Sequence, residues 1–314
     1  METTHTQIEF EQIVERGCGI DVHKSVIVAT IRGTGIKEET RTFSGFTFSI
    51  EEMRDWLKIN DITHVAMEST GVYWKPIFNI LEADFEIILV NARHIKNVPG
   101  HKTDKKDSKW IAKLLLSGLL KGSFIPKKPI RELRDLTRYK RKIIEQVASE
   151  KNRIQKILED ANIKLSSVIS DMDGATATKI LNAMLSGVDD IEELLKFRHG
   201  KIQSSKEDLA AALKGNLTTH HKFMLQTIKM SITEKEAIIA LIDKQIDNHL
   251  KENELELDAK LLTSIPGVGK EGASYILAEI GSEMEQFPNE NHLSSWAGIS
   301  PGNDESAGKK KVVA

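Results

Sequence analysis

Four acidic residues in the N-terminal third of the chain have types and spacings suited to metal-ion chemistry. Asp21 stands in the segment GIDVHKS, Glu68 in VAMESTGVYW, and Asp104 and Asp107 lie three residues apart in HKTDKKDSKW. Four carboxylates at one point would repel one another, so a shared site makes sense chiefly if divalent cations neutralise them. Because Mg²⁺ takes oxygen ligands, keeps waters and pairs with phosphate oxygens, the chemistry indicated is strand cleavage or transfer on nucleic acid.

The elements predicted around these acids would bring them to one place. Asp21 ends or nearly ends a strand, Glu68 follows another strand, and Asp104 and Asp107 open a helix and share one of its faces. The predicted order is three strands, helix, strand, helix, strand and helix, at Cys18–Val22, Ser25–Ile31, Arg41–Phe46, Ser49–Ile59, His64–Met67, Trp74–Ala83, Glu86–Val90 and Asp104–Leu120. Ser49 with Glu52 predicts a capping box for the first helix. An antiparallel hairpin that leads into βαβ units gives a mixed sheet with helices on its faces, an order that matches the ribonuclease H-like fold and its RuvC branch.

A simpler interpretation exists for each acid by itself. A single Asp or Glu is more often a helix cap, a surface charge or an ion-pair partner, and Asp104 could simply cap its helix. The metal-site interpretation is favoured because all four acids fall at the required places in the element order.

The charge of the chain is unevenly distributed. The 314 residues have a net charge of −2, but residues 91–142 contain sixteen Lys or Arg and four Asp or Glu, which leaves that segment at +12. Such asymmetry indicates an anionic polymer as a partner, although a solvated helical face would also account for it. The basic residues predicted to contact phosphates are Lys102, Lys105, Lys106, Lys109, Arg134, Arg138, Arg141 and Lys142.

Two long segments in the middle of the chain predict long helices. The segment from about Ile130 to Ala161 contains neither Pro nor Gly and has an imperfect heptad pattern that Lys140 and Glu150 interrupt. A second apolar pattern covers about His220–Leu250, and shorter helices are expected between the two. These helices could form an antiparallel stalk or a dimerisation arm, or a bundle that folds back on its own chain.

The C-terminal region contains two further features. The segment LLTSIPGVGKEGASYILAEIG predicts a helix-hairpin-helix, in which Gly267 and Gly269 allow close approach of a phosphate and Lys270 begins the second helix. A tight turn between two packed helices is the simpler interpretation. After it, Ser306 stands in a Gly-containing loop beside Lys309 and Lys310, where it could attack phosphate or be an ordinary exposed serine.

Five segments taken together, GIDVHKS, MESTGVYW, KTDKKDSKWIAKLL, SIPGVGKEGASYILAEIG and WAGISPGNDESAGKKK, closely resemble the DEDD transposases of the insertion-sequence-110 family, which are related to Piv-type DNA invertases. The resemblance implies a RuvC-like domain, a coiled-coil insertion and a C-terminal transposase domain, which we place at residues 1–125, 126–255 and 256–314. It also implies that Asp21, Glu68, Asp104 and Asp107 bind Mg²⁺. By the same resemblance, Ser306 attacks DNA to form a 5′-phosphoserine intermediate at the carboxylate site of a partner subunit. A structured bridge RNA that pairs with target and donor DNA, and assembly into dimers or tetramers, are further implications.

The resemblance includes one departure. Family members continue with further helices after the serine loop, whereas this chain ends eight residues after Ser306. We therefore expect a C-terminally truncated member with weak or no recombination by itself. A non-catalytic remnant that only binds DNA and RNA, and a RuvC-like metal-dependent nuclease that uses water, remain as alternative functions.

Composition excludes several other classes of protein. The single residue Cys18 excludes an internal disulfide framework and a cysteine-rich zinc site. The apolar stretches are far shorter than the ~20 residues that span a bilayer, and the N-terminus has no signal-peptide pattern. The expected location is the cytoplasm of a bacterium or archaeon, in association with the nucleoid.

Overall fold

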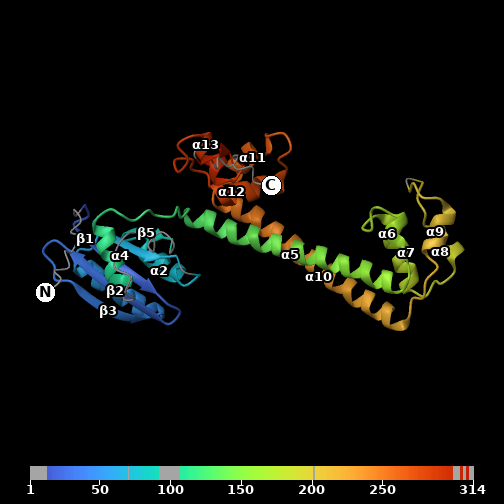
Figure 1. The fold of residues 1–314 in the computed structure, drawn as a ribbon, viewed down its shortest axis with the longest axis horizontal. Coiled ribbons are helices and arrows are strands. Elements are labelled where there is room, and N and C mark those ends of the chain that lie inside the picture. Colours follow the sequence, from blue (N-terminus) through green and yellow to red (C-terminus); the bar gives the residue numbers. More distant parts are fainter. Residues whose placement is uncertain are drawn as a thin grey trace. The chain divides into compact units, whose positions relative to one another are not determined.

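The computed structural model describes residues 13–69, 71–91, 107–200, 202–299, 305–306 and 309–310, with the backbone alone at 107 and in the last two segments. It divides into two compact units, Met1–Ile125 and Pro126–Ala314, which are described separately below. Both are drawn in Figure 1.

The first unit is built on a five-stranded mixed sheet. The strands are β1 (Arg16–Val22), β2 (Val26–Gly33), β3 (Glu39–Ser44), β4 (His64–Glu68) and β5 (Glu86–Val90), in the spatial order β3-β2-β1-β4-β5. The first three strands form an antiparallel meander, and β4 and β5 extend the sheet in parallel with β1. The hairpin between β1 and β2 is tight, whereas the parallel pairs need helical crossovers, as predicted from the element order.

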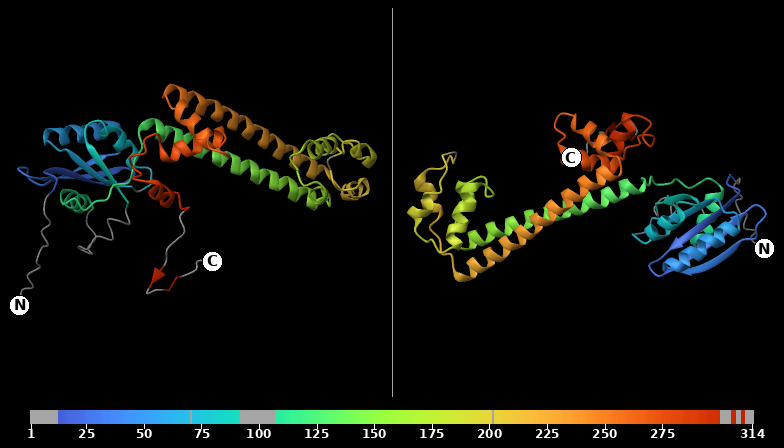
Figure 2. Two further views of the ribbon diagram at one scale, coloured as in Figure 1. Left: turned by 90° about the horizontal axis from the view of Figure 1, so that it is seen from above. Right: turned by 180° about the vertical axis from the view of Figure 1, so that it is seen from behind.

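Helices cover both faces of this sheet. The helices α1 (Thr47–Ile59) and α2 (Trp74–Leu81) pack over one face, where Ile20, Val65 and Met67 belong to the main core of the unit. The helix α4 (Asp107–Leu116) packs on β1, β2 and β4 over the other face (Figure 2). A mixed sheet between helical layers is compatible with a ribonuclease H-like domain and confirms the α/β class expected for this part of the chain.

One predicted local feature of this unit is wrong. Ser49 does not cap the first helix, because α1 begins earlier, after Phe46, and Ser49 is buried inside it. The Ser49 hydroxyl accepts a hydrogen bond from the Ser44 backbone N–H instead, at 3.0 Å. The side chain therefore ties the helix start to the end of β3, a tertiary role that the local pattern does not reveal.

The second unit is dominated by two long helices, α5 (Lys128–Asp160) and α10 (Thr219–Glu252), which lie side by side (Figure 1). The start of α5 packs on the end of α10, where Leu133 and Ile246 belong to one core cluster, and the end of α5 packs on the start of α10. The two helices are therefore antiparallel and bury their apolar seam within one chain. The predicted antiparallel arrangement is present within one chain, and a role of the long pair as a dimerisation arm stays a prediction.

Shorter helices complete both ends of this long pair. At the end of the pair where α5 ends and α10 begins, four short helices share one core with the long helices: α6 (Leu165–Val168), α7 (Ala175–Leu185), α8 (Ile191–Leu195) and α9 (Lys206–Ala212). At the other end, α11 (Glu256–Thr263) and α12 (Lys270–Ile280) follow α10, and then come α13 (Glu290–Trp296) and the two-residue strands β6 (Glu305–Ser306) and β7 (Lys309–Lys310). A boundary near residue 255 between a coiled-coil domain and a C-terminal domain stays a prediction.

Candidate active site

Asp21 and Glu68 occupy equivalent places on two neighbouring parallel strands. Gly19 is paired with Ala66 and Ile20 with Met67, so the next step of the same register sets Asp21 beside Glu68. Neighbouring strands lie about 4.8 Å apart. The two acids therefore stand side by side at the carboxyl edge of β1 and β4, as the sequence predicted for strand-end carboxylates.

The same two acids belong to the face of the sheet that α4 covers. A Cβ atom built on Gly17 would lie 2.8 Å from Leu115 Cδ2, and one built on Gly19 would lie 2.2 Å from the Ser108 carbonyl oxygen. In a strand, every second residue lies on the same face, so Asp21 follows Gly17 and Gly19 onto the α4 side. On β4, Ala66 packs against Ile111 and Leu115 of α4, and Glu68 is two residues further along.

The helix α4 runs antiparallel to β1, and its first residue is therefore near the acids. Gly17 meets Leu115 late in the helix, whereas Gly19 meets Ser108 and Ala112 earlier in it. The Ser108 hydroxyl also lies 2.9 Å from the Thr30 hydroxyl, on the strand next to Gly19. The N-terminus of α4, which begins with the backbone of Asp107, therefore lies toward the Asp21 end of β1.

Three of the four predicted carboxylate positions thus converge on one edge of the sheet at the level of the backbone. Asp104 lies outside the described residues, and of Asp107 the structure describes the backbone alone. The part of the chain with described side chains contains no group of three His, Cys, Asp or Glu that could hold a metal ion.

The described surroundings of Asp21 are polar. The Asp21 carboxylate is 18% exposed, and its Oδ2 atom lies 3.3 Å from Nε2 of His23, which is itself 68% exposed. A carboxylate that is largely covered yet reachable from solvent, with a second carboxylate on the adjacent strand, is a donor set suited to a hard divalent cation. The residues present therefore fit Mg²⁺.

The predicted phosphate-binding lysines near the acids are only partly described. Lys102, Lys105 and Lys106 lie outside the described residues, as do the side chains of Lys309 and Lys310. Lys109 is described, and its ammonium lies 3.1 Å from Oε1 of Glu38, so it is paired within the unit.

Ser306 is described only through its backbone. It pairs with Lys309 in the small antiparallel ladder of β6 and β7, and Glu305 pairs with Lys310. The sequence predicted a loop here and did not predict the ladder, which does not test the role of the serine.

Two arginines of the second unit that the sequence predicts to contact nucleic acid bind another helix of the same unit in the structure. Arg134 of α5 donates hydrogen bonds from Nε and Nη2 to the carbonyl oxygens of Ala278 and Glu279, at 2.9 and 3.0 Å. Arg138 forms a forked pair with the Glu279 carboxylate, in which both distances are 2.8 Å. This pair holds the pKa of Glu279 below its ordinary value. Both arginines therefore bind the C-terminal end of α12, where partial negative charge collects.

Lys140, which interrupts the heptad pattern, has a defined partner set. Its side chain is only 6% exposed and its ammonium lies 2.6 Å from Asp243 of α10 and 2.5 Å from Glu271 of α12. Burial opposes its charge, but the hydrogen bonds from Lys140 to these two carboxylates outweigh burial and raise the pKa of the ammonium. The interruption is therefore an ionic junction of three helices, α5, α10 and α12.

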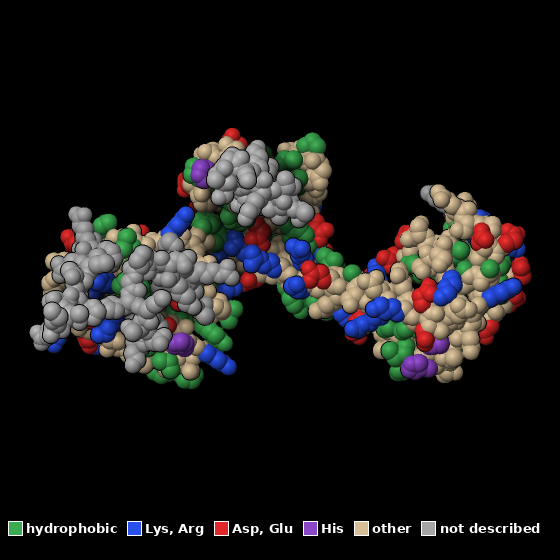
Figure 3. Space-filling view, in the orientation of Figure 1, with side chains coloured by type: hydrophobic (Ala, Val, Ile, Leu, Met, Phe, Trp, Pro, Cys, Tyr) green, Lys and Arg blue, Asp and Glu red, His purple; other side chains and the backbone are tan. Residues whose placement is uncertain are grey.

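The remaining predicted cations of this unit are also paired or exposed. Arg141 and Lys142 both reach Glu145 on their own helix, at 3.4 and 2.8 Å. On the face drawn in Figure 3, basic and acidic side chains alternate along the long helices. The surface of this part of the long pair is thus mixed in charge, and residues 128–142 contribute less free positive charge than the sequence count suggested.

The predicted hairpin corresponds to α11, a short turn and α12. The two helices pack on each other, and Gly267 in the turn has φ of +88°, which a residue with a side chain adopts poorly. The N-cap of α12 is Gly269, and Lys270 pairs with Asp247 of α10 at 2.7 Å. The geometry gives two helices joined by a glycine turn; their use as a DNA-binding helix-hairpin-helix stays a prediction.

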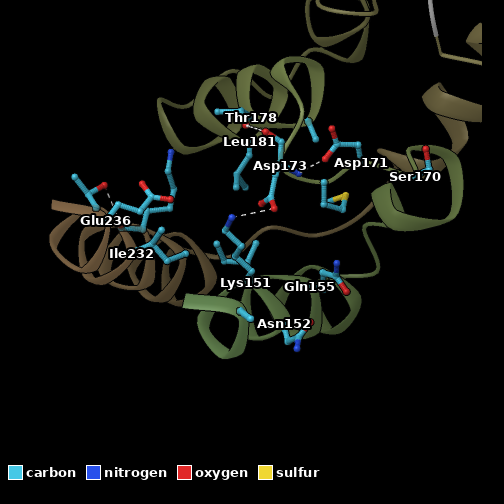
Figure 4. A pocket seen from close by; sticks show the side chains of 16 residues that line it. Lys151, Asn152, Gln155, Ser170, Asp171, Asp173, Thr178, Leu181, Ile232 and Glu236 are labelled. Carbon is cyan, nitrogen blue, oxygen red and sulfur yellow. Dashed lines mark hydrogen bonds and ion pairs between the residues drawn. The ribbon is translucent and has the colours of Figure 1, made fainter. Parts of the chain in front are cut away.

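A separate hollow of about 560 Å³ lies in the second unit among α5, α7 and α10 (Figure 4). An ion pair between Lys151 and Asp173, 2.9 Å long, crosses it. Lys229 also lines the hollow, and burial lowers the pKa of its ammonium. None of the predicted site residues contributes to this hollow.

The mixed sheet between helical layers is compatible with the ribonuclease H-like class of domain. Comparison with known families agrees. Residues 18–163 match the family model of DEDD transposases of the IS110 type, described as a transposase, and residues 259–313 match the model described as the transposase IS116/IS110/IS902 family. No curated protein matches the chain. The chain belongs to the IS110 family of transposases, enzymes whose substrate is DNA.

The structure also bears on membrane association. Within the described ranges, no helix combines the length and the apolar character needed to cross a bilayer.

Proposed function

We propose that this protein is a DNA recombinase of a mobile insertion sequence that cuts and rejoins strands at the carboxyl edge of β1 and β4. The observation that carries the proposal is the register of these strands, which sets Asp21 beside Glu68 on the face where α4 begins at Asp107. Carboxylates from separate parts of the chain converge there although they are isolated in the sequence.

The residues proposed to hold Mg²⁺ are Asp21, Glu68, Asp104 and Asp107. When bound, the ions would neutralise the carboxylates, polarise a phosphate oxygen and lower the pKa of an attacking hydroxyl. His23, 3.3 Å from the Asp21 carboxylate, orients that side chain. The packing of α4 on Gly17 and Gly19 fixes the distance between the helix start and the strand ends.

The proposed nucleophile is Ser306. Its hydroxyl oxygen would form a bond to phosphorus while the bond from phosphorus to the 3′ oxygen breaks, and the proton of the serine passes to the leaving 3′ oxygen. The product is a 5′-phosphoserine that retains the energy of the cut bond, so the reverse attack by a 3′ hydroxyl rejoins DNA without ATP.

A bridge RNA, paired with donor and target DNA, is the proposed guide. The +12 segment at residues 91–142 supports an anionic polymer as a partner, with its centre in Lys102, Lys105 and Lys106 rather than in the paired arginines of α5. Assembly as a dimer or tetramer, which the family resemblance implies, is part of the same proposal.

The experiment is a search for a covalent protein–DNA adduct. Purified full chain is incubated with Mg²⁺, the non-coding RNA that flanks its gene and radiolabelled donor DNA, and the products are separated on a denaturing gel. We expect an adduct in the wild type and its loss in Ser306→Ala, Asp21→Asn and Glu68→Gln, with DNA binding retained. Chelation of the metal should abolish the adduct as well.

A matched control comes from the same unit. Asp55 is an exposed carboxylate paired with its neighbour Arg54 at 2.9 Å, so Asp55→Asn should leave the adduct unchanged. Metal-dependent cleavage without any adduct would replace the serine mechanism with water attack by a nuclease. Salt-sensitive binding with neither cleavage nor adduct would instead identify a non-catalytic binding protein.

A further inference from the structure

Two exposed phenylalanines stack on each other at the turn between β3 and α1. The ring centroids of Phe46 and Phe48 are 6.1 Å apart and the ring planes differ by only 10°. The residues are 70% and 61% exposed. They form a nearly parallel pair of flat apolar surfaces in solvent, in contrast to the scattered single side chains that are usual on protein surfaces.

This pair lies at the same edge of the sheet as the carboxylates. Ser44, the last residue of β3, is paired with Val26 at the start of β2, and the Val26 carbonyl accepts a hydrogen bond from the His23 backbone N–H at 2.9 Å. The next residue, Gly45, donates from its backbone N–H to the Ser25 carbonyl at 3.3 Å. The turn that contains the phenylalanines therefore adjoins the loop that directly follows Asp21.

The separation is short on the scale of a nucleic acid. The ends of β3 and β1 are two strand spacings apart, which amounts to about 10 Å between their backbones. At a rise of about 3.4 Å per nucleotide in a stacked strand, this corresponds to at least three nucleotide steps. Phe48 belongs to α1, which covers the face of the sheet opposite to α4 and Asp21, so a strand with a phosphate at Asp21 would pass over the edge of the sheet to place a base on the phenylalanines.

The fold itself gains little from either ring. Phe46 is the N-cap of α1, a position where Ser, Thr, Asp or Asn would bond to the first N–H groups, and the absence of such a cap costs about 1 kcal/mol. Both rings leave most of their surface in water, so they contribute little hydrophobic stabilisation. The neighbouring Phe43 and Trp56, by contrast, pack against each other at 5.7 Å beside the core.

An exposed cation lies near the pair. Lys24 is exposed in the loop that Gly45 touches, where a Cβ on Gly45 would lie 3.0 Å from the Lys24 carbonyl oxygen. The exposed acids Glu51 and Glu52 follow one turn later on α1, so the charge around the rings is mixed. The stacked rings, with a lysine on the side of the carboxylates, are the feature that resembles surfaces where phosphates meet cations and bases stack on rings.

We infer that Phe46 and Phe48 are a stacking platform for an unpaired nucleobase of the strand processed at Asp21 and Glu68. This inference rests on the proposed function and adds to it a binding site for a base that has left the duplex. The platform does not discriminate between bases, because every base has a flat face on which a ring can stack. It would hold the strand in place while the phosphate is at the carboxylates.

The test uses full-length protein and a single-stranded oligonucleotide of about 20 nucleotides of mixed sequence that contains 2-aminopurine, in DNA and RNA versions. Stacking quenches 2-aminopurine fluorescence, and anisotropy gives the Kd. We expect Phe46→Ala with Phe48→Ala to weaken binding roughly tenfold or more and to remove the protein-dependent quenching. Phe46→Trp with Phe48→Trp should retain both signals.

Ile59→Ala is the matched control, because Ile59 is 81% exposed at the other end of the same helix. It should bind as the wild type does, and circular dichroism confirms that each variant is folded. Unchanged affinity and quenching in the double alanine variant would overturn the platform and leave the proposed function standing. If the wild type binds neither oligonucleotide, the platform fails and the adduct experiment alone decides the proposed function, whereas a normal platform with no covalent adduct refutes only the recombinase chemistry.

Discussion

Gly19→Ala tests the link between the packing of α4 and the geometry of the acid edge. A Cβ at position 19 would lie 2.2 Å from the Ser108 carbonyl oxygen and 2.3 Å from the Ala112 backbone nitrogen. Both are backbone atoms of α4, so no side chain can rotate out of the way. Since Cβ contacts shorter than 3.0 Å essentially do not occur, the helix must move by at least about 0.8 Å.

Two costs follow from this movement. Overpacking of a well-packed interior typically costs 1–3 kcal/mol, and stretching the 2.9 Å hydrogen bond between Ser108 and Thr30 costs about 1 kcal/mol more. We therefore expect the free energy of unfolding to fall by about 2–4 kcal/mol. Because the shift displaces Asp107 from Asp21, and a misplacement of about 1 Å can cost 10²-fold in rate, adduct formation should fall by about two orders of magnitude.

The assay combines urea unfolding with the rate of Mg²⁺-dependent adduct formation, measured where the variant is folded. Gly122→Ala is the control in the same unit, because its Cβ would meet only a methyl group of Ile88 at 3.4 Å. A Gly19→Ala protein as stable as the wild type would refute the close approach of α4 to β1. A destabilised protein with full activity would instead show that the position of α4 does not set the chemistry.

Three other predictions concern single side chains. Arg134→Met should lower the free energy of unfolding by about 2 kcal/mol in urea titrations, because two hydrogen bonds to the end of α12 are lost. Arg141→Gln, on a 78% exposed side chain, should change the free energy of unfolding by less than about 0.5 kcal/mol. Equal effects of the two substitutions would contradict the role of Arg134 in holding α12 on α5. The hydrogen bond from Arg138 depresses the pKa of Glu279 below 4.5, so its stabilising effect is present above that pH and is lost as the pH falls through the lower folded value. Urea midpoints between about pH 6 and pH 3 should therefore fall less in Glu279→Gln than in the wild type, and parallel curves would argue against the pair. Burial raises the pKa of the Cys18 thiol, so iodoacetamide should label it only after unfolding, as mass spectrometry would show; rapid labelling of the native protein would disprove its burial.

The secondary structure of the first unit could be predicted because its signals are local. Alternating apolar residues gave the strands, and β4 and β5 begin and end close to the predicted residues. The failed prediction at Ser49 shows the limit of local patterns. The Ser-x-x-Glu spacing suggested a cap, but the hydroxyl binds the backbone of Ser44 at the end of another element.

In the second unit, the sequence predicted the long helices but did not show which charges are paired within the chain. Arg134 and Arg138 look like phosphate ligands in a basic run, yet they bind the C-terminal end of α12, more than a hundred residues away in sequence. Lys140 looked like a break in the heptad and is a buried junction of three helices. Which cations remain available for a nucleic acid depends on partners that no local window contains.

The sequence by itself determined the family, the order of the elements and the four acidic positions, because these depend on residue types and on spacings along the chain. Only the tertiary structure decided that β4 lies beside β1, that Asp21 and Glu68 share the α4 face, and that α4 begins at their edge. It also decided that Phe46 and Phe48 remain in solvent while Trp56 is buried. The physical reason is that strand order, helix direction and burial arise from packing between distant segments. The hydrophobic periodicity along the sequence does not specify which distant segments pack together.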